Sequence, residues 1–323
     1  MKILVTGANG FVGSNLVQKL LESQHDVSVL VRNHWNGEGE VNVITGDLLK
    51  PQSLQSINES YDVAYYLVHG LSEKQEDFEF LESSCAVNFL HWIGDRCKKI
   101  IYLGGIAPHD DVLSPHLRSR KLTGEILGVG KIPVLEFRAS IILGKGSVSY
   151  EMIKAISERF PFRPKWRILN QICQPLSLAD LLAYLEEAML LDIKDHKIIE
   201  IAGPNAISYG ELLDLFSKTA GLDRIQLPVP DLDNKTIGII LNHAIPELSE
   251  VGSKLAASLD HSTEQTDFTA EKLFPTIKPQ EIQEVLRKLE DEIDYRYTMI
   301  WDKEFLKEVL GDKISFLKGL YGK

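Results

Sequence analysis

The stretch "KILVTGANGFVG", residues 2–13, decides the fold. An apolar run typical of a buried strand leads into Gly7, Gly10 and Gly13, and then into a helical pattern over residues 11–22. The first glycine allows a tight turn, the second lets the backbone approach a pyrophosphate, and the third lets the helix pack closely on the strand. Because strand, glycines and helix stand in this order, the stretch predicts a dinucleotide-binding turn rather than a purely structural loop. The free amides of the helix N-terminus would face the phosphates.

Apolar, β-branched runs alternate with helical patterns through the first half of the chain. Predicted strands cover residues 2–6, 26–31, 41–45, 62–68, 99–105 and 132–140. Such alternation is typical of βαβ units and predicts an α/β fold, a Rossmann doubly wound parallel sheet. It stops after Gly146, so we expect an NAD(P)-binding core over residues 1–146 and a smaller, mainly helical substrate-side region over 147–323. One further strand, residues 197–203, is expected to return to the core.

The composition limits the classes of partner. The 323-residue chain is 44% hydrophobic and 25% charged, as in a globular protein with a large core, and its net charge is -11. Because a negative field repels phosphates, we expect no nucleic-acid or membrane partner. Three irregularly spaced cysteines predict neither disulfides nor a zinc site, and no metal-binding motif occurs. With no leader or membrane span expected, the sequence favours a cytoplasmic location. A homodimer or a protein partner remains open.

The choice of cofactor is expected to depend on the end of the second strand. An acidic residue there would bind the ribose 2′-hydroxyl of NAD, but this chain has Arg32, with no acidic residue before Glu38. A guanidinium can bind a 2′-phosphate through charge-assisted hydrogen bonds, so the sequence favours NADP over NAD. The alternative is that Arg32 is only a solvated charge. After the third strand, Asp47 can accept a hydrogen bond from adenine or cap the following turn.

Several segments, in this order and spacing, resemble the atypical short-chain dehydrogenase/reductase proteins, especially the NmrA-like and bacterial YbjT-type group. The segments are "TGANGFVG", "GDL", "YYLVHG", "IIYLGG", "SPHLRSRKLTGEIL" and "FRASIILGKGS". The resemblance covers about residues 1–290 and leaves the last thirty or so unassigned. It implies a Rossmann fold with a small C-terminal substrate-side domain.

The resemblance also implies cofactor contacts at matching positions of this sequence. Arg32 would bind the 2′-phosphate, and Asp47 and Leu48 would contact the adenine. The residues that would contact the pyrophosphate are Gly7, Asn9, Gly10, Phe11 and Val12. Those that would line the cofactor near its ribose are Leu67, Val68 and His69.

The sequence departs from this family at the catalytic positions. Active relatives use a serine after the fifth strand, a tyrosine, and a lysine four residues beyond the tyrosine. Here Gly104 and Gly105 replace the serine region, His116 stands at the tyrosine position and Arg120 at the lysine position. The spacing of four puts His116 and Arg120 on one helical face, where His116 can act as a general acid and Arg120 can hold a ribose hydroxyl or a substrate oxygen. Alternatively, both only bind the cofactor or each other.

Two functions therefore remain open from the sequence. The first is an NADP-dependent oxidoreductase with a non-standard proton donor, acting on an unknown small or moderately apolar substrate held between the two regions. The second is a non-catalytic dinucleotide-binding protein, such as a redox sensor or an assembly factor. His69 could line the cofactor near its ribose, or it could only be a packing or capping residue. Tyr150 and Glu151 could reach a substrate or only open an exposed helix.

Overall fold

The computed structural model describes residues 1–55, 58–69, 78–107, 113–160, 162–222, 224–227, 230–233, 236–237, 239 and 261–289. The unassigned C-terminal segment of about thirty residues lies outside these ranges.

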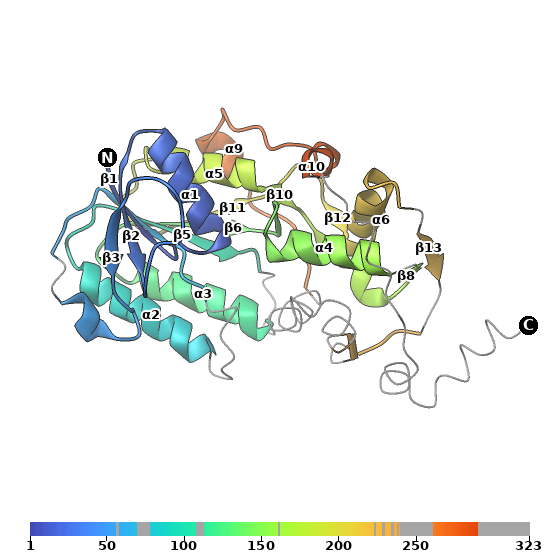
Figure 1. Cartoon of the computed structure of the whole chain (residues 1–323), viewed down its shortest axis with the longest axis horizontal. Coiled ribbons are helices and arrows are strands. Elements are labelled where there is room, and N and C mark those ends of the chain that lie inside the picture. Colours follow the sequence, from blue (N-terminus) through green and yellow to red (C-terminus); the bar gives the residue numbers. More distant parts are fainter. Residues whose placement is uncertain are drawn as a thin grey trace, which may run out of the picture.

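A seven-stranded sheet with the order β11-β6-β5-β4-β1-β2-β3 forms the centre of the molecule (Figure 1). Every neighbouring pair of strands is parallel. The strands are β1 (Lys2–Thr6), β2 (Asp26–Val31), β3 (Asn42–Thr45), β4 (Val63–Tyr66), β5 (Ile100–Gly105), β6 (Val134–Ala139) and β11 (Lys197–Ile201). This confirms the predicted α/β fold. The strand order reverses between β1 and β4, and ligands of such sheets bind at the carboxyl ends of the strands beside this point.

Helices cover both faces of the sheet because alternate strand residues point to opposite sides. Ile3 and Val5 belong to one apolar cluster, together with residues of α1 (Phe11–Glu22), α5 (Leu178–Glu187) and α9 (Thr269–Leu273). Leu4 belongs to a second cluster on the other face. That cluster contains residues of η1 (Pro51–Leu54), α2 (Phe78–Ile93) and α3 (Pro115–Gly128). Alternate residues of β1 thus pack against helices on opposite faces of the sheet.

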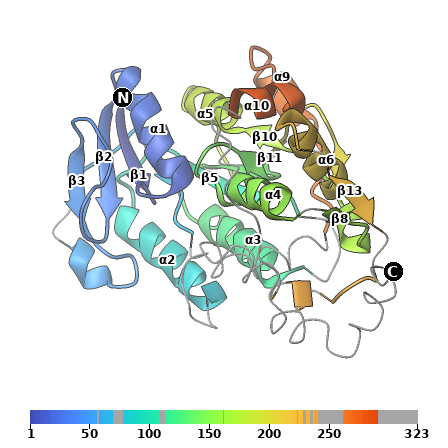
Figure 2. The same ribbon diagram turned by 45° about the vertical axis from the view of Figure 1, so that its right-hand side comes forward.

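A third apolar cluster holds the smaller C-terminal part together, beside one end of the sheet (Figure 2). It contains residues of α4 (Val148–Arg159), α6 (Tyr209–Thr219) and α10 (Ile282–Leu289). A second short 3-10 helix, η2, covers Arg167–Asn170. Three short strand pairs brace this part: β7 (Ile142–Leu143) with β10 (Leu176–Ser177), β9 (Ile172–Cys173) with β12 (Ile207–Ser208), and β8 (Phe162–Pro164) with β13 (Ile225–Leu227). Within the described residues, no helix is both long and apolar enough to span a membrane.

Helix α3 begins where its sequence provides a cap. The hydroxyl of Ser114 accepts a hydrogen bond from the backbone N–H of Leu117, and Pro115 occupies the first turn, where its missing N–H costs nothing. His116 therefore lies in the first turn of α3, and Arg120 lies one turn later on the same face. The cap fixes the start of the helix, so it also fixes the positions of these two side chains beside the sheet edge.

Candidate functional site

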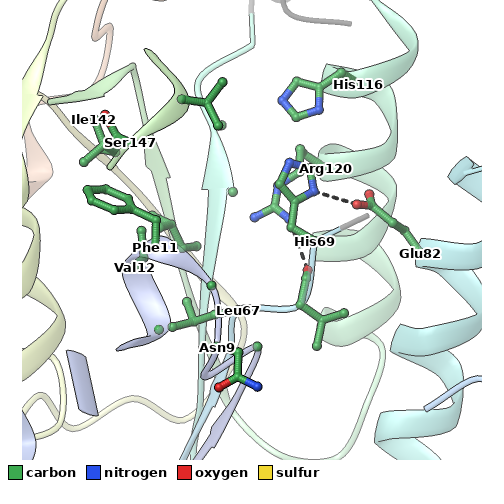
Figure 3. A pocket seen from close by; sticks show the side chains of 18 of the residues that line it. Asn9, Phe11, Val12, Leu67, His69, Glu82, His116, Arg120, Ile142 and Ser147 are labelled. Carbon is green, nitrogen blue, oxygen red and sulfur yellow. Dashed lines mark hydrogen bonds and ion pairs between the residues drawn. The ribbon is translucent and has the colours of Figure 1, made fainter. Parts of the chain in front are cut away.

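A cavity of about 790 Å³ lies at the carboxyl ends of β1, β4 and β5, between the sheet and the C-terminal part. All fourteen residues predicted to form the site line it: Gly7, Asn9, Gly10, Phe11, Val12, Gly13, Arg32, Asp47, Leu48, Leu67, Val68, His69, His116 and Arg120. Figure 3 shows Phe11, Ile142 and Ser147 on one side of this cavity, and His69, His116 and Arg120 on the other. The structure therefore brings residues from five separate sequence segments together, while the role of each remains a prediction.

The glycine turn is packed too closely for side chains. Gly7 has a φ of +69°, and a Cβ atom there would lie 2.5 Å from the carbonyl carbon of Leu67 and 2.9 Å from the nitrogen of Val68. A Cβ atom at Gly13 would lie 2.9 Å from the Cα atom of Ala8. The N–H of Gly10 closes the turn by donating to the Gly7 carbonyl at 2.9 Å. This backbone-only cradle at the start of α1 fits the pyrophosphate of a dinucleotide.

Asn9 connects the glycine turn to the loop that follows β2. Its side-chain amide donates to the carbonyl of His34 at 2.9 Å, and its oxygen accepts from the backbone N–H of Asn36 at 3.1 Å. Arg32 lies at the start of this loop, exposed at the rim of the cavity. The side chain of Asn9 thus helps to fix the segment that carries Arg32, and a role in contacting pyrophosphate is a separate prediction.

Asp47 lines the cavity and also caps the turn after β3. Its Oδ1 atom accepts from the backbone N–H of Leu49 at 3.0 Å, and its Oδ2 atom lies 3.8 Å from Nζ of Lys50. The turn-capping alternative is therefore present in the structure. Adenine recognition by Asp47 stays a prediction, and the neighbouring side chain of Leu48 is buried.

Arg120 is a buried cation without a carboxylate partner among the described residues. Arg120 is only 8% exposed. Its Nη1 atom donates a long hydrogen bond of 3.5 Å to the carbonyl of Val68, and its guanidinium carbon lies 4.9 Å from the ring centre of Tyr102. Burying a charge is costly unless hydrogen bonds or an opposite charge compensate. A polar or anionic ligand in the cavity would supply that compensation.

A second ionisable group faces the same wall of the cavity. Nδ1 of His69 lies 2.6 Å from Oε1 of Glu82, which is 5% exposed, and the other carboxylate oxygen of Glu82 accepts from the hydroxyl of Ser119. The rings of His69 and His116 are 5.0 Å apart between their centres. β4 ends at Tyr66, two residues earlier than predicted, so His69 lies three residues beyond the strand. Two imidazoles, a guanidinium and a carboxylate therefore meet at one place.

Sequence reasoning missed Glu82. A signal for it exists, because Glu82 precedes Cys85, Ala86 and Phe89 at the helical spacing of a buried stripe, and all three are buried. An acidic residue within such a stripe needs a hydrogen-bonding partner inside the protein. The partners, His69 and Ser119, come from segments that helical periodicity cannot connect to α2.

The C-terminal wall of the cavity is uncharged among its described residues. It consists of apolar side chains and a few hydroxyl groups: Ser140, Ile141, Ile142, Ser147, Val148, Ser149, Met152, Ile153, Ile156, Leu169, Tyr209, Leu213 and Thr263. The hydroxyls of Ser140 and Thr263 lie 2.8 Å apart, and burial raises the pKa of Tyr209 well above its ordinary value. This wall favours contact with an apolar molecule.

Tyr150 and Glu151 do not line the cavity, so neither side chain reaches a substrate there. The Tyr150 hydroxyl donates to the carbonyl of Leu289, and Glu151 accepts from the N–H of Gly146. Both residues therefore hold the first turn of α4 in place. Among the described residues, no three histidine, cysteine or acidic side chains group as metal ligands would.

Comparisons with known proteins agree with this fold. Residues 3–107 match the model of the NAD dependent epimerase/dehydratase family, which confirms the resemblance to short-chain dehydrogenase/reductase proteins. No curated protein matches the chain in sequence.

Solved structures similar to this chain include nucleotide-sugar epimerases. A nucleoside-diphosphate-sugar epimerase from Staphylococcus aureus is 15% identical, with a TM-score of 0.68, and the match covers 89% of this chain and 100% of that chain. A UDP-glucose 4-epimerase from Thermotoga maritima, solved with UDP-glucose, is 15% identical with a TM-score of 0.66, covering 90% and 98%. The Thermus thermophilus UDP-glucose 4-epimerase, solved with NAD, is 16% identical with a TM-score of 0.65 and the same coverage. At these identities the likeness establishes the fold alone.

Proposed function

We propose that this chain, whose fold is of the NAD(P)-binding epimerase/dehydratase type, is an NADP-dependent oxidoreductase that acts on a small carbonyl compound. The single observation that carries the proposal is the buried guanidinium of Arg120. It lies on the cavity wall, without a carboxylate partner among the described residues, at the position of the family's lysine. A nicotinamide ribose or a substrate oxygen would complete its hydrogen bonding.

The residues at the other end of the cavity fit NADP. The turn at Gly7 and Gly13 has no room for side chains and leaves backbone amides for the pyrophosphate. Arg32 stands exposed at the rim, where its guanidinium would bind a 2′-phosphate, and Asn9 braces its loop. We propose NADP in preference to NAD because the described lining of this end contains an arginine and has its acidic residue, Asp47, engaged in a turn.

The substrate that we propose is largely apolar and carries a carbonyl group. A diphosphate would need cations, and the described residues of the C-terminal wall carry none, in contrast to the sheet side with Arg32 and Arg120. Apolar side chains such as Met152, Ile153 and Leu213 instead favour a hydrocarbon body, with the reacting carbonyl near Arg120.

In this proposal an imidazole replaces the family's tyrosine as proton donor. Bound NADPH would supply a hydride, and the protein's own groups supply the proton and the orientation. Arg120 holds an oxygen of the cofactor ribose or the substrate, and a histidine of the same wall protonates the carbonyl oxygen. His116, at the tyrosine position, is the sequence-based candidate.

Single-turnover oxidation of protein-bound NADPH tests this function. The parent protein is mixed with a panel of apolar aldehydes and ketones while NADPH absorbance is followed. We expect oxidation by at least one apolar carbonyl compound. Tight NADPH binding without oxidation by any compound would instead favour a non-catalytic dinucleotide-binding protein, whose response to NADPH is a change in stability or partner binding.

A further inference from the structure

A buried carboxylate contacts one imidazole of the cavity directly. Glu82 extends from α2 toward His69 with 2.6 Å between Oε1 and Nδ1, and the hydroxyl of Ser119 on α3 binds its other oxygen. The side chain of Glu82 is 5% exposed, whereas that of His69 is 25% exposed and lines the cavity. Figure 3 shows this contact beside Arg120. The buried carboxylate of Glu82 thus contacts the imidazole of His69, which also lines the cavity and can contact a ligand there.

Three positive or potentially positive groups share this wall. The ring centres of His69 and His116 are 5.0 Å apart, and the guanidinium of Arg120 lies on the same side of the cavity. Like charges at such distances repel strongly where water is largely excluded. Protonation of one ring therefore disfavours protonation of the other. The carboxylate of Glu82 favours the charged form of the ring that it contacts, which is His69.

Other titratable groups near Glu82 do not compete for this proton. The phenols of Tyr66 on β4 and Tyr102 on β5 are buried, and burial raises the pKa of both well above the ordinary range, so they stay neutral. The Tyr102 hydroxyl already donates to the carbonyl of Arg120 at 2.8 Å. From α2, the thiol of Cys85 lines the same cavity. Among the described residues, Glu82 is thus the carboxylate that contacts His69.

We infer that Glu82 is a positioning residue that makes His69 the proton-carrying residue of this site. This inference rests on the proposed function. Glu82 accepts the Nδ1–H of His69, and in the charged ring Nε2 carries the proton that the substrate oxygen would take. Bound NADPH would supply a hydride to the carbonyl carbon, and His69 would give its Nε2 proton to the carbonyl oxygen, so that an alcohol and NADP⁺ would result. His69 would then be a neutral ring that still donates to Glu82, and solvent would return one proton. His116 then contacts the substrate as a neutral ring.

The position of the proton can be measured without cofactor or substrate. Histidine side chains labelled with ¹⁵N are titrated by NMR in the full-length protein, and the two signals are assigned with His69→Gln and His116→Gln. We expect the titration midpoint of His69 to lie above that of His116, with Nδ1 protonated. Glu82→Gln, which keeps the shape of the side chain, should lower the His69 midpoint by about one pH unit or more.

Glu79→Gln is the matched control. Glu79 also lies on α2 and pairs with Arg118 of α3 at 2.5 Å, but neither residue lines the cavity. This variant should leave the His69 midpoint unchanged. A midpoint of His116 above that of His69, or no response of His69 to Glu82→Gln, would overturn the inference.

Single-turnover hydride transfer provides the second readout. With NADPH saturating in both proteins, His69→Gln should slow it by about 10²- to 10⁴-fold, the usual loss for a missing general acid. Glu82→Gln should shift the pH profile to lower pH by the amount seen in NMR, and Glu82→Asp should restore part of the shift. A loss in His116→Gln but not in His69→Gln would refute our assignment and leave the oxidoreductase standing. If the parent oxidises no bound NADPH, the proposed function fails, and the NMR titration still decides which ring holds the proton.

Discussion

Replacing Gly7 by alanine tests how the glycine turn depends on the chain after β4. Gly7 has a φ of +69°, so an alanine there costs about 1–2 kcal/mol in backbone strain. Its Cβ atom would also lie 2.5 Å from the carbonyl carbon of Leu67 and 2.9 Å from the nitrogen of Val68. These are backbone atoms that cannot rotate away, and forcing such an overlap costs a further 1–3 kcal/mol, roughly. We expect Gly7→Ala to lower the free energy of unfolding by about 2–5 kcal/mol in total.

Gly221→Ala separates the strain from the overlap. Gly221 has a φ of +65°, and a Cβ atom there meets nothing within 4 Å. Its alanine variant should therefore lose only the strain, about 1–2 kcal/mol. The reduction in unfolded-state entropy is the same in both variants and cancels in the comparison. Urea unfolding followed by circular dichroism measures both free energies, and NADPH titration should show weaker binding for Gly7→Ala alone. Equal destabilisation of the two variants would refute the argument that Leu67 holds the turn in place.

Three further predictions concern the cofactor and the thiols. In a fluorescence titration, the parent should bind NADPH more tightly than NADH. Arg32→Asp should reverse this order and weaken NADPH binding by about 2 kcal/mol, or about 30-fold. Equal midpoints for the two cofactors in the parent would contradict the NADP proposal. Arg120→Met should weaken NADPH binding about 10- to 100-fold. Because it removes a buried charge, it should leave the free energy of unfolding without cofactor unchanged or higher. The control Arg118→Met, on the exposed side of α3, should change neither affinity nor stability appreciably. Burial raises the pKa of Cys97 to about 11 and that of Cys173 to about 12, from 9.0. The two neutral thiols therefore stabilise the folded state fully below pH 9, and this stabilisation is lost as pH rises through 11 to 12. Between pH 8 and 11, the free energy of unfolding should fall less for a Cys97→Ala, Cys173→Ala double variant than for the parent.

Local sequence was sufficient for the sheet and for one end of the site. Strands such as Lys2–Thr6 and Ile100–Gly105 are apolar runs between clear breaks, and α1 follows the glycines at the predicted residues, Phe11–Glu22. The glycine turn could be predicted because strand, turn and helix are consecutive in the chain. The first turn of α3 was likewise predictable, since Ser114 and Pro115 are adjacent to the residues whose positions they fix.

The tertiary structure decided which side chains meet in the cavity. Glu82 and Ser119 lie 37 residues apart, and only the packing of α2 beside α3 on one face of the sheet brings Ser119 to the Glu82 side chain that contacts His69. The sequence pointed to Tyr150 as a residue that could reach a substrate, but packing on Phe216 and a hydrogen bond to Leu289 turn it into the C-terminal core. Periodicity reports which face of an element is buried. It carries no information about the partner buried against that face, because that partner is chosen by the packing of segments far apart in the chain.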